Sequence, residues 1–146
     1  MLSDYGRKVE IKENIYTMRE IKFRGKQLST GKWLYGDLLH DNQGGCYIYP
    51  LEAENIYKEN KVDVSSVGQA TGVKDKNGKE VYEGDIVTYI KEWDGLDHKF
   101  YEIVVFQEGS FLAGECGREI CECDELTIIG NTTDNHDIKF GYYKDV

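Results

Sequence analysis

The segment from Val67 to Tyr89 constrains the fold of this chain more than any other part of its sequence. It places Asn77-Gly78 between two stretches of alternating apolar and polar residues, a strong signal for a β-hairpin. Gly84-Asp85 then begins another apolar stretch, which predicts a sharp bend into a new strand with the Asp carboxylate accepting backbone N–H groups. The segment supplies backbone geometry but no nucleophile, base or ligand set, so it predicts a scaffold.

Two registers of this hairpin are compatible with the sequence. A two-residue turn would pair Lys76 with Lys79, and like charges directly opposite each other destabilise a sheet. A type I turn that starts at Asp75, followed by Gly78 in the left-handed conformation, shifts the register by one residue and sets Asp75 beside Lys79. We therefore predict the bulged turn.

Short stretches of high β propensity alternate with turn signals along the rest of the chain. A weak helix candidate over 51–60 interrupts them, and a loop with one helical turn fits the same residues. The pattern predicts a mainly β protein: a small, partly open β-barrel, SH3-like or related, of short antiparallel strands with one or two short helices. Besides the hairpin, strands are predicted at 19–24, 32–39, 46–49, 61–67, 100–107, 111–113 and 125–129.

The length of 146 residues fits one domain. Residues 1–17 have no clear pattern and are predicted to be an N-terminal extension, so Met18 is a candidate translation start directly before the first strand. The β domain is predicted over 18–146, with a polar C-terminal tail from about residue 131.

Charge and hydropathy narrow the functional classes. The formal net charge of −9 repels the phosphate backbone, so nucleic acid is not expected as a direct ligand. The first residues do not resemble a secretion signal, and no run approaches the ~20 apolar residues of a membrane span. We expect a soluble, cytoplasmic protein without a membrane partner.

The best binding candidates lie near the start of the predicted domain. Lys22, Arg24 and Lys26 alternate along a predicted strand, so they share one face, and Trp33 follows on the next strand. The competing interpretation is the solvated outer face of an antiparallel sheet. Trp93 is a further candidate, because the segment 93–98 reads either as a binding loop or as the tip of a long hairpin.

The cysteines form no strong metal motif. Cys116, Cys121 and Cys123 have the spacing C-x4-C-x-C, and Cys46 would have to join them from far upstream to complete a zinc site. Ordinary thiols are the expected alternative, and no metal or cofactor is predicted.

Catalytic patterns are missing from the sequence. There is no phosphate-binding glycine loop, no G-x-S-x-G and no H-E-x-x-H. Glu83 and Asp85 form a conceivable carboxylate pair, but carboxylates are common in turns. We therefore predict no catalytic residues and no enzymatic activity.

Three stretches resemble the YopX family of phage and prophage proteins. They are Met18–Arg24, the central segment from Val67 to Val87, and Ile128–Asn131. The resemblance implies a small, mainly β protein encoded by a phage or an integrated element, acting in the cytoplasm of a bacterial host. It brings no catalytic residues.

Together these observations favour a non-enzymatic accessory protein. A β module with exposed strand edges and many tyrosines suits binding to another protein of the host or phage, or to a second copy of itself. The alternatives are a nucleic-acid-associated module built on the basic strand, or an acidic mimic of DNA that acts on a host nucleic-acid enzyme.

Overall fold

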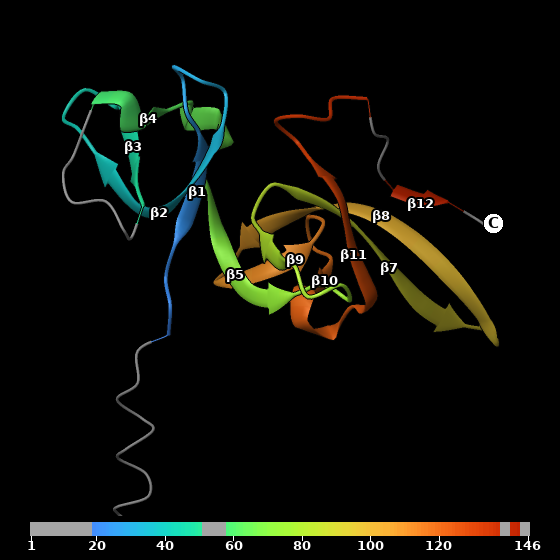
Figure 1. Cartoon of the computed structure of the whole chain (residues 1–146). Helices are drawn as coiled ribbons and strands as arrows, with labels where there is room; N and C mark the ends of the chain where they lie inside the picture. The colour runs from blue at the N-terminus through green and yellow to red at the C-terminus, as the bar shows by residue number, and fades with distance from the viewer. Residues whose placement is uncertain (1–18, 51–57, 138–140, 144–146) are drawn as a thin grey trace, which may run out of the picture.

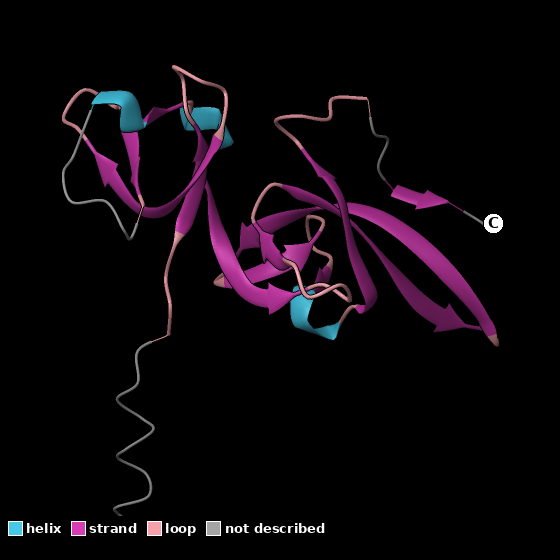
Figure 2. Cartoon of the chain, in the orientation of Figure 1, coloured by secondary structure: helices cyan, strands magenta, loops and turns pink. Residues whose placement is uncertain are grey.

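The computed structural model describes residues 19–50, 58–137 and 141–143, and β-strands dominate them (Figure 1, Figure 2). The predicted mainly β class is confirmed. Helical structure in this part of the chain consists of the short 3₁₀ turns η2 (Lys58–Asn60), η3 (Val64–Ser66) and η4 (Ile120–Glu122). None of these helical segments has the length and apolar character needed to cross a membrane. The strands are β1 (Phe23–Lys26), β2 (Trp33–His40), β3 (Cys46–Tyr49), β4 (Lys61–Val62), β5 (Gly68–Lys74), β6 (Glu80–Tyr82), β7 (Asp85–Trp93), β8 (Leu96–Gln107), β9 (Ser110–Ala113), β10 (Arg118–Glu119), β11 (Asp124–Asn131) and β12 (Gly141–Tyr143).

The first sheet is antiparallel, with the strand order β4-β3-β2-β1-β5-β6. It curls until the end of β1 meets β4, where Gln27 and Val62 form an isolated bridge and the Asp63 N–H donates to the Lys26 carbonyl. The sheet is therefore partly closed at this end, as in a partly open barrel, although the described strands complete no closed barrel.

The second sheet is also antiparallel, with the order β10-β9-β8-β7-β11, and β12 pairs with the first part of β8. β7 and β8 form a long hairpin whose far end extends away from the other strands (Figure 1). Asp94 and Gly95 make its turn with φ values of 56° and 74°, as a two-residue type I′ turn requires. Residues 93–98 are therefore the tip of a long hairpin, and β8 begins four residues before the strand predicted at 100–107.

Two hydrophobic clusters stabilise the two sheets. The smaller one lies in the curl of the first sheet around Ile48 and Val62, and the larger one surrounds Val87 and Val104 in the second sheet. β6 connects them, because it pairs with β5 in the first sheet while its Val81 belongs to the larger cluster. Burying each such branched side chain contributes about 1.5–3 kcal/mol, so the larger cluster links the first sheet to the second, while the smaller one stabilises the first sheet alone.

The β5–β6 hairpin adopts the predicted bulged register. The Gly78 N–H donates to the Asp75 carbonyl at 2.9 Å, the Asp75 N–H donates to the Lys79 carbonyl at 2.8 Å, and φ of Gly78 is 83°. One Asp75 carboxylate oxygen accepts the N–H groups of Asn77 and Lys79, and the other accepts that of Ile128 on β11 at 3.1 Å. The sequence did not predict this last bond, which ties the turn to the second sheet.

Some predictions concern residues outside the described ranges. The N-terminal extension over 1–17 and the candidate start at Met18 both lie there. Of the helix candidate 51–60, the structure describes Lys58–Asn60 as a 3₁₀ turn. The predicted polar tail begins at the end of β11. Of its described residues, 132–137 form turns and bends, and Gly141–Tyr143 form β12, which pairs with β8.

Gly78→Val should destabilise the protein by about 1–2 kcal/mol more than Gly78→Asn, because a β-branched residue resists positive φ whereas Asn tolerates it. A Cβ atom on Gly78 would meet no atom within 4 Å, so the comparison isolates the backbone conformation. Urea denaturation of both variants measures the difference, and equal losses of stability would contradict the expected cost of the left-handed turn.

Candidate functional site

A cleft of about 430 Å³ lies where the two sheets meet. Its walls come from β1 and β2 on one side, from β7, β11 and the following turn on the other, and from β6. Clefts of this size between structural units are common sites of ligand binding. It is termed the junction cleft below, and it is lined by the aromatic residues Trp33, Tyr35 and Tyr82 and the charged residues Arg24, Lys79, Glu80, Asp85 and Asp134.

A buried ion pair in the cleft wall joins β1 to β7. Arg24 Nη2 lies 2.8 Å from Asp85 Oδ1, and the two side chains are 8% and 3% exposed. The second Asp85 oxygen accepts the Tyr82 N–H at 2.7 Å, which confirms the predicted role of this carboxylate in the bend. Burial raises the pKa of Asp85, and the Arg24 charge opposes that rise. The pair must stay together, because one of these charges left alone in the interior would be strongly destabilising.

Aromatic rings cover the Arg24 guanidinium. Its central carbon is 4.7 Å from the centroid of the Trp33 ring and 4.9 Å from that of Tyr82, distances at which a ring face attracts a cation. Tyr35 packs edge-on against Tyr82, and its own side chain is exposed. The Arg24 Nε–H is buried and has no hydrogen-bond acceptor among the described residues.

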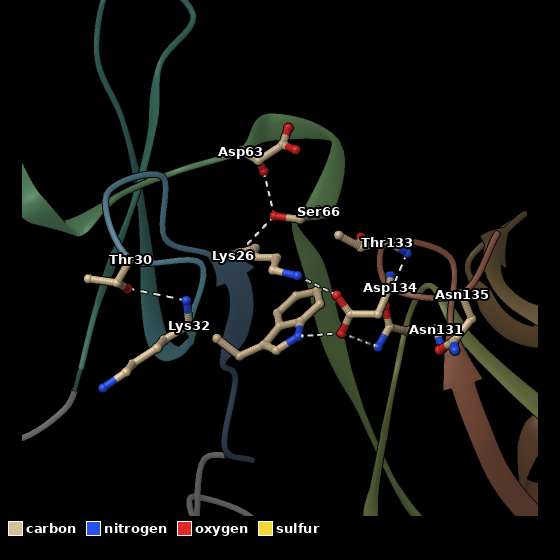
Figure 3. Close-up of polar contacts among 10 residues, drawn as sticks. Lys26, Thr30, Lys32, Asp63, Ser66, Asn131, Thr133, Asp134 and Asn135 are labelled. Atoms are coloured by element: carbon tan, nitrogen blue, oxygen red, sulfur yellow. Dashed lines mark hydrogen bonds and ion pairs between the residues drawn. The ribbon is translucent and has the colours of Figure 1, made fainter.

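Asp134 holds the turn after β11 against the first sheet. Its carboxylate accepts a bond from Lys26 Nζ, from Trp33 Nε1 at 2.9 Å and from the Asn131 amide at 3.1 Å (Figure 3). The bond from Lys26 is the largest cause that lowers the pKa of Asp134 to about 2, followed by the bonds from Trp33 and Asn131. This second polar connection fixes the position of Trp33 in the cleft wall.

The remaining two charges of the cleft differ in their surroundings. Glu80 lies 2.8 Å from Lys22 Nζ, and this bond raises the pKa of Lys22, which also contacts the exposed Glu20 at 3.4 Å. Lys79 is exposed and forms no ion pair with any residue in the described part of the chain. Lys79 is thus the cation of the cleft that no carboxylate neutralises directly.

Of the five predicted binding candidates, Arg24 and Trp33 line the junction cleft, whereas Lys22 and Lys26 pair with carboxylates that line it. Lys22, Arg24 and Lys26 alternate along one face as predicted, and Trp33 packs on Arg24. The interpretation of this face as a solvated outer surface is wrong for Arg24, which is 7% exposed. Arg24 is buried because Asp85 on β7 pairs with it and the rings of Trp33 and Tyr82 cover its guanidinium.

Trp93 does not take part in the junction cleft. It lies at the end of β7, and its ring stacks on His98 with 3.6 Å between centroids. Stacking between these two side chains gives the hairpin tip a local packing contact, which accounts for an aromatic residue at this position.

Sequence reasoning missed the parts of the site that come from distant segments. Asp85 was assigned to the bend alone, although a charge at the start of the buried run Asp85–Tyr89 is a signal that a cation must be near. Tyr82 and Asp134 carried no comparable signal. Their partners on β1 and β2 are distant in the sequence, and only the docking of the two sheets brings them into contact.

The cysteines lie in different places. Cys46 is buried in the smaller hydrophobic cluster, whereas Cys116, Cys121 and Cys123 lie near β10 and η4. Within the described ranges, no three His, Cys, Asp or Glu side chains are grouped to hold a metal ion. Burial raises the pKa of Cys123 to about 12, which favours the protonated thiol over the reactive thiolate.

Two further hollows are less suited to be the site. One of about 600 Å³ lies beside β10 in the second sheet, next to Cys116 and Arg118. Another of about 390 Å³ lies on the other side of Arg24, beside Ser66 and Thr132. The junction cleft differs from both because it combines three aromatic side chains with the buried ion pair and with Lys79, which forms no ion pair with a described residue.

Comparisons with known proteins agree with the fold. A family model described as YopX protein matches residues 22–137, a range that includes every residue defining the junction cleft. Protein EF1440 from Enterococcus faecalis, a solved crystal structure, is similar with 22% identity and a TM-score of 0.54, over 82% of this chain and 98% of that chain. This likeness supports the fold alone. No curated protein matches the sequence.

Arg24→Met should destabilise the protein by about 3 kcal/mol or more, because it leaves the Asp85 charge buried without a cation. Asp85→Asn removes that charge while keeping an acceptor for the Tyr82 N–H. The double variant should therefore be more stable than Arg24→Met alone. Urea denaturation in a double-mutant cycle measures the coupling, and additive losses would show that the two charges do not depend on each other.

An NMR titration of the Asp134 carboxyl should give a pKa of about 2, against an ordinary value of 3.8. Since the folded pKa is the lower one, the contribution of Asp134 to stability is present above the ordinary value and is lost as the pH falls through about 2. The change in stability should be small, because Asp134 is 35% exposed and solvent screens it.

Lys26→Met should return the pKa of Asp134 toward its ordinary value. Lys76→Met is the matched control, since Lys76 contacts the exposed Glu125 at 3.6 Å outside the cleft. A shift of the Asp134 pKa by the control variant, or no shift with Lys26→Met, would contradict the assigned cause.

Proposed function

This chain belongs to the YopX protein family, and we propose that it is a non-enzymatic accessory protein of a phage or prophage that binds another protein through the junction cleft. We further propose that it acts in the cytoplasm of a bacterial host. The observation that carries the proposal is the composition of the cleft: aromatic side chains beside a buried Arg24, with Tyr35 47% exposed. Tyr, Trp and Arg are the side chains most enriched at protein interfaces and among their dominant contacts.

The state of the cleft carboxylates supports binding rather than catalysis. A general base must be able to take a proton from a substrate. Here each carboxylate already meets a cation, and those of Asp85 and Asp134 accept further hydrogen bonds from Tyr82 and Trp33. The carboxylates of Asp85 and Asp134 hold the two sheets together, and that of Glu80 is paired with Lys22 within the first sheet.

The charges of β1 also weigh against the nucleic-acid alternative. A nucleic-acid-binding face would need Lys22, Arg24 and Lys26 to be available to phosphates. Each of them is paired with a carboxylate instead, and the formal net charge of −9 adds repulsion. The other alternative, an acidic mimic of DNA, would use the acidic surface and not the cleft.

Site-specific photo-crosslinking in host cells tests the proposal. The full chain would carry p-benzoylphenylalanine in place of Tyr35 at the cleft or, as the control, in place of Leu96, which is 64% exposed at the distant hairpin tip. A discrete protein adduct is expected from position 35 and not from position 96. An adduct of twice the chain's mass would identify a second copy as the partner.

Two patterns of adducts would contradict the proposal, and so would one result with a further variant. One is the same set of adducts from both positions, because contact would then not involve the cleft. The other is an adduct from position 35 that contains nucleic acid. A crosslink from position 35 that persists equally when Trp33 is replaced by Ala would also argue against recognition by the aromatic wall.

A further inference from the structure

The charges of the junction cleft indicate the chemistry of its occupant, in an inference that rests on the proposed function. Every carboxylate that lines the cleft has a cation within ion-pair distance, whereas one ammonium, that of Lys79, has no such partner among the residues described. Lys79 is exposed, and its charge acts on Asp75 and Asp85 without direct contact. The cleft therefore has one positive charge without an ion-pair partner among the described residues.

A second, independent observation points to a missing acceptor. Arg24 lines the same cleft, is 7% exposed, and carries a buried Nε–H with no acceptor in the described ranges. Buried N–H groups almost always have a hydrogen-bond partner, so an exception requires an explanation. A group that brings acceptor oxygens into the cleft would provide one.

We propose that the junction cleft binds a carboxylate group presented by a protein partner. A carboxylate has one negative charge and two acceptor oxygens, so it can match the ammonium of Lys79 and accept a bond from the Arg24 guanidinium. Trp33 and Tyr35 contact the apolar part of the same segment. The carboxylate belongs to an acidic side chain or to the C-terminus of the partner chain.

A single carboxylate fits this protein better than a run of phosphates does. Binding of nucleic acid gains most of its affinity from many cations that contact successive phosphates. Among the described residues, Lys79 is the one cation lining the junction cleft that has no ion pair, in a chain with a formal net charge of −9. One charged side chain can enter such a local site, whereas an extended polyanion meets repulsion from the rest of the surface.

An NMR titration of the full chain with short blocked peptides tests the inference. The probes are acetyl-Leu-Glu-Leu-amide, its neutral isostere acetyl-Leu-Gln-Leu-amide, acetyl-Leu-Gln-Leu with a free C-terminal carboxylate, and a twelve-nucleotide single-stranded DNA. The Arg24 Nε–H and the Trp33 indole N–H report on the cleft, and the Trp93 indole N–H at the hairpin tip is the internal control.

The Glu peptide should shift the Arg24 and Trp33 signals and leave that of Trp93 in place. The neutral isostere should bind about tenfold more weakly, as expected when a charge-assisted contact is lost. Lys79→Gln should weaken the Glu peptide by a similar factor. Lys74→Gln, which removes an exposed charge from the same hairpin outside the cleft, is the matched control and should have no effect.

The results separate this inference from the proposed function. Tighter binding of the peptide with a free C-terminus than of the Glu peptide supports the carboxylate and identifies its source as a chain terminus, whereas the reverse order identifies an acidic side chain. Equal binding of the Glu and Gln peptides, equal effects of the two lysine variants, or displacement of the Glu peptide by DNA would overturn the carboxylate inference. If no peptide shifts the Arg24 or Trp33 signals at millimolar concentration, the inference also fails, whereas the crosslinking experiment still decides whether a protein occupies the cleft.

Discussion

The buried ion pair between Arg24 and Asp85 is the interaction on which the arrangement of the two sheets depends. Apolar burial joins the sheets where Val81 of the first sheet enters the larger cluster, whereas the smaller cluster lies within the first sheet alone. The ion pair connects β1 directly to β7, and the rings of Trp33 and Tyr82 shield it from water. Because an unpaired charge in this position would be very costly, the pair favours one relative placement of the sheets over others.

The same connection creates the candidate site. Beside the apolar contact of Val81, the sheets meet through charged and aromatic side chains, and a cleft of about 430 Å³ is left beside this contact. The groups that join the sheets also line this cleft. Binding there would act on the contact between the sheets, since Arg24 and Trp33 belong both to the cleft wall and to the polar bridges. The proposed recognition would thus use the same residues as the contact between the sheets.

Local sequence rules worked where all the deciding residues are neighbours. The like charges of Lys76 and Lys79 selected the bulged register, and the hydrogen bonds of Asp75 and Gly78 confirm it. The alternation of Lys22, Arg24 and Lys26 correctly placed them on one face. The exposure of that face was predicted wrongly for Arg24, because exposure depends on what packs against a strand and not on the strand itself.

The sequence by itself determined the β class, the turn at Gly78 and the side-chain alternation of β1, since backbone sterics and pleating act over a few residues. Only the tertiary structure decided which carboxylate neutralises which cation. Lys26 and Asp134 are 108 positions apart, and the Asp75 carboxylate accepts the Ile128 N–H across 53 positions. Such pairings depend on how two curved sheets dock, and chain order does not specify that geometry.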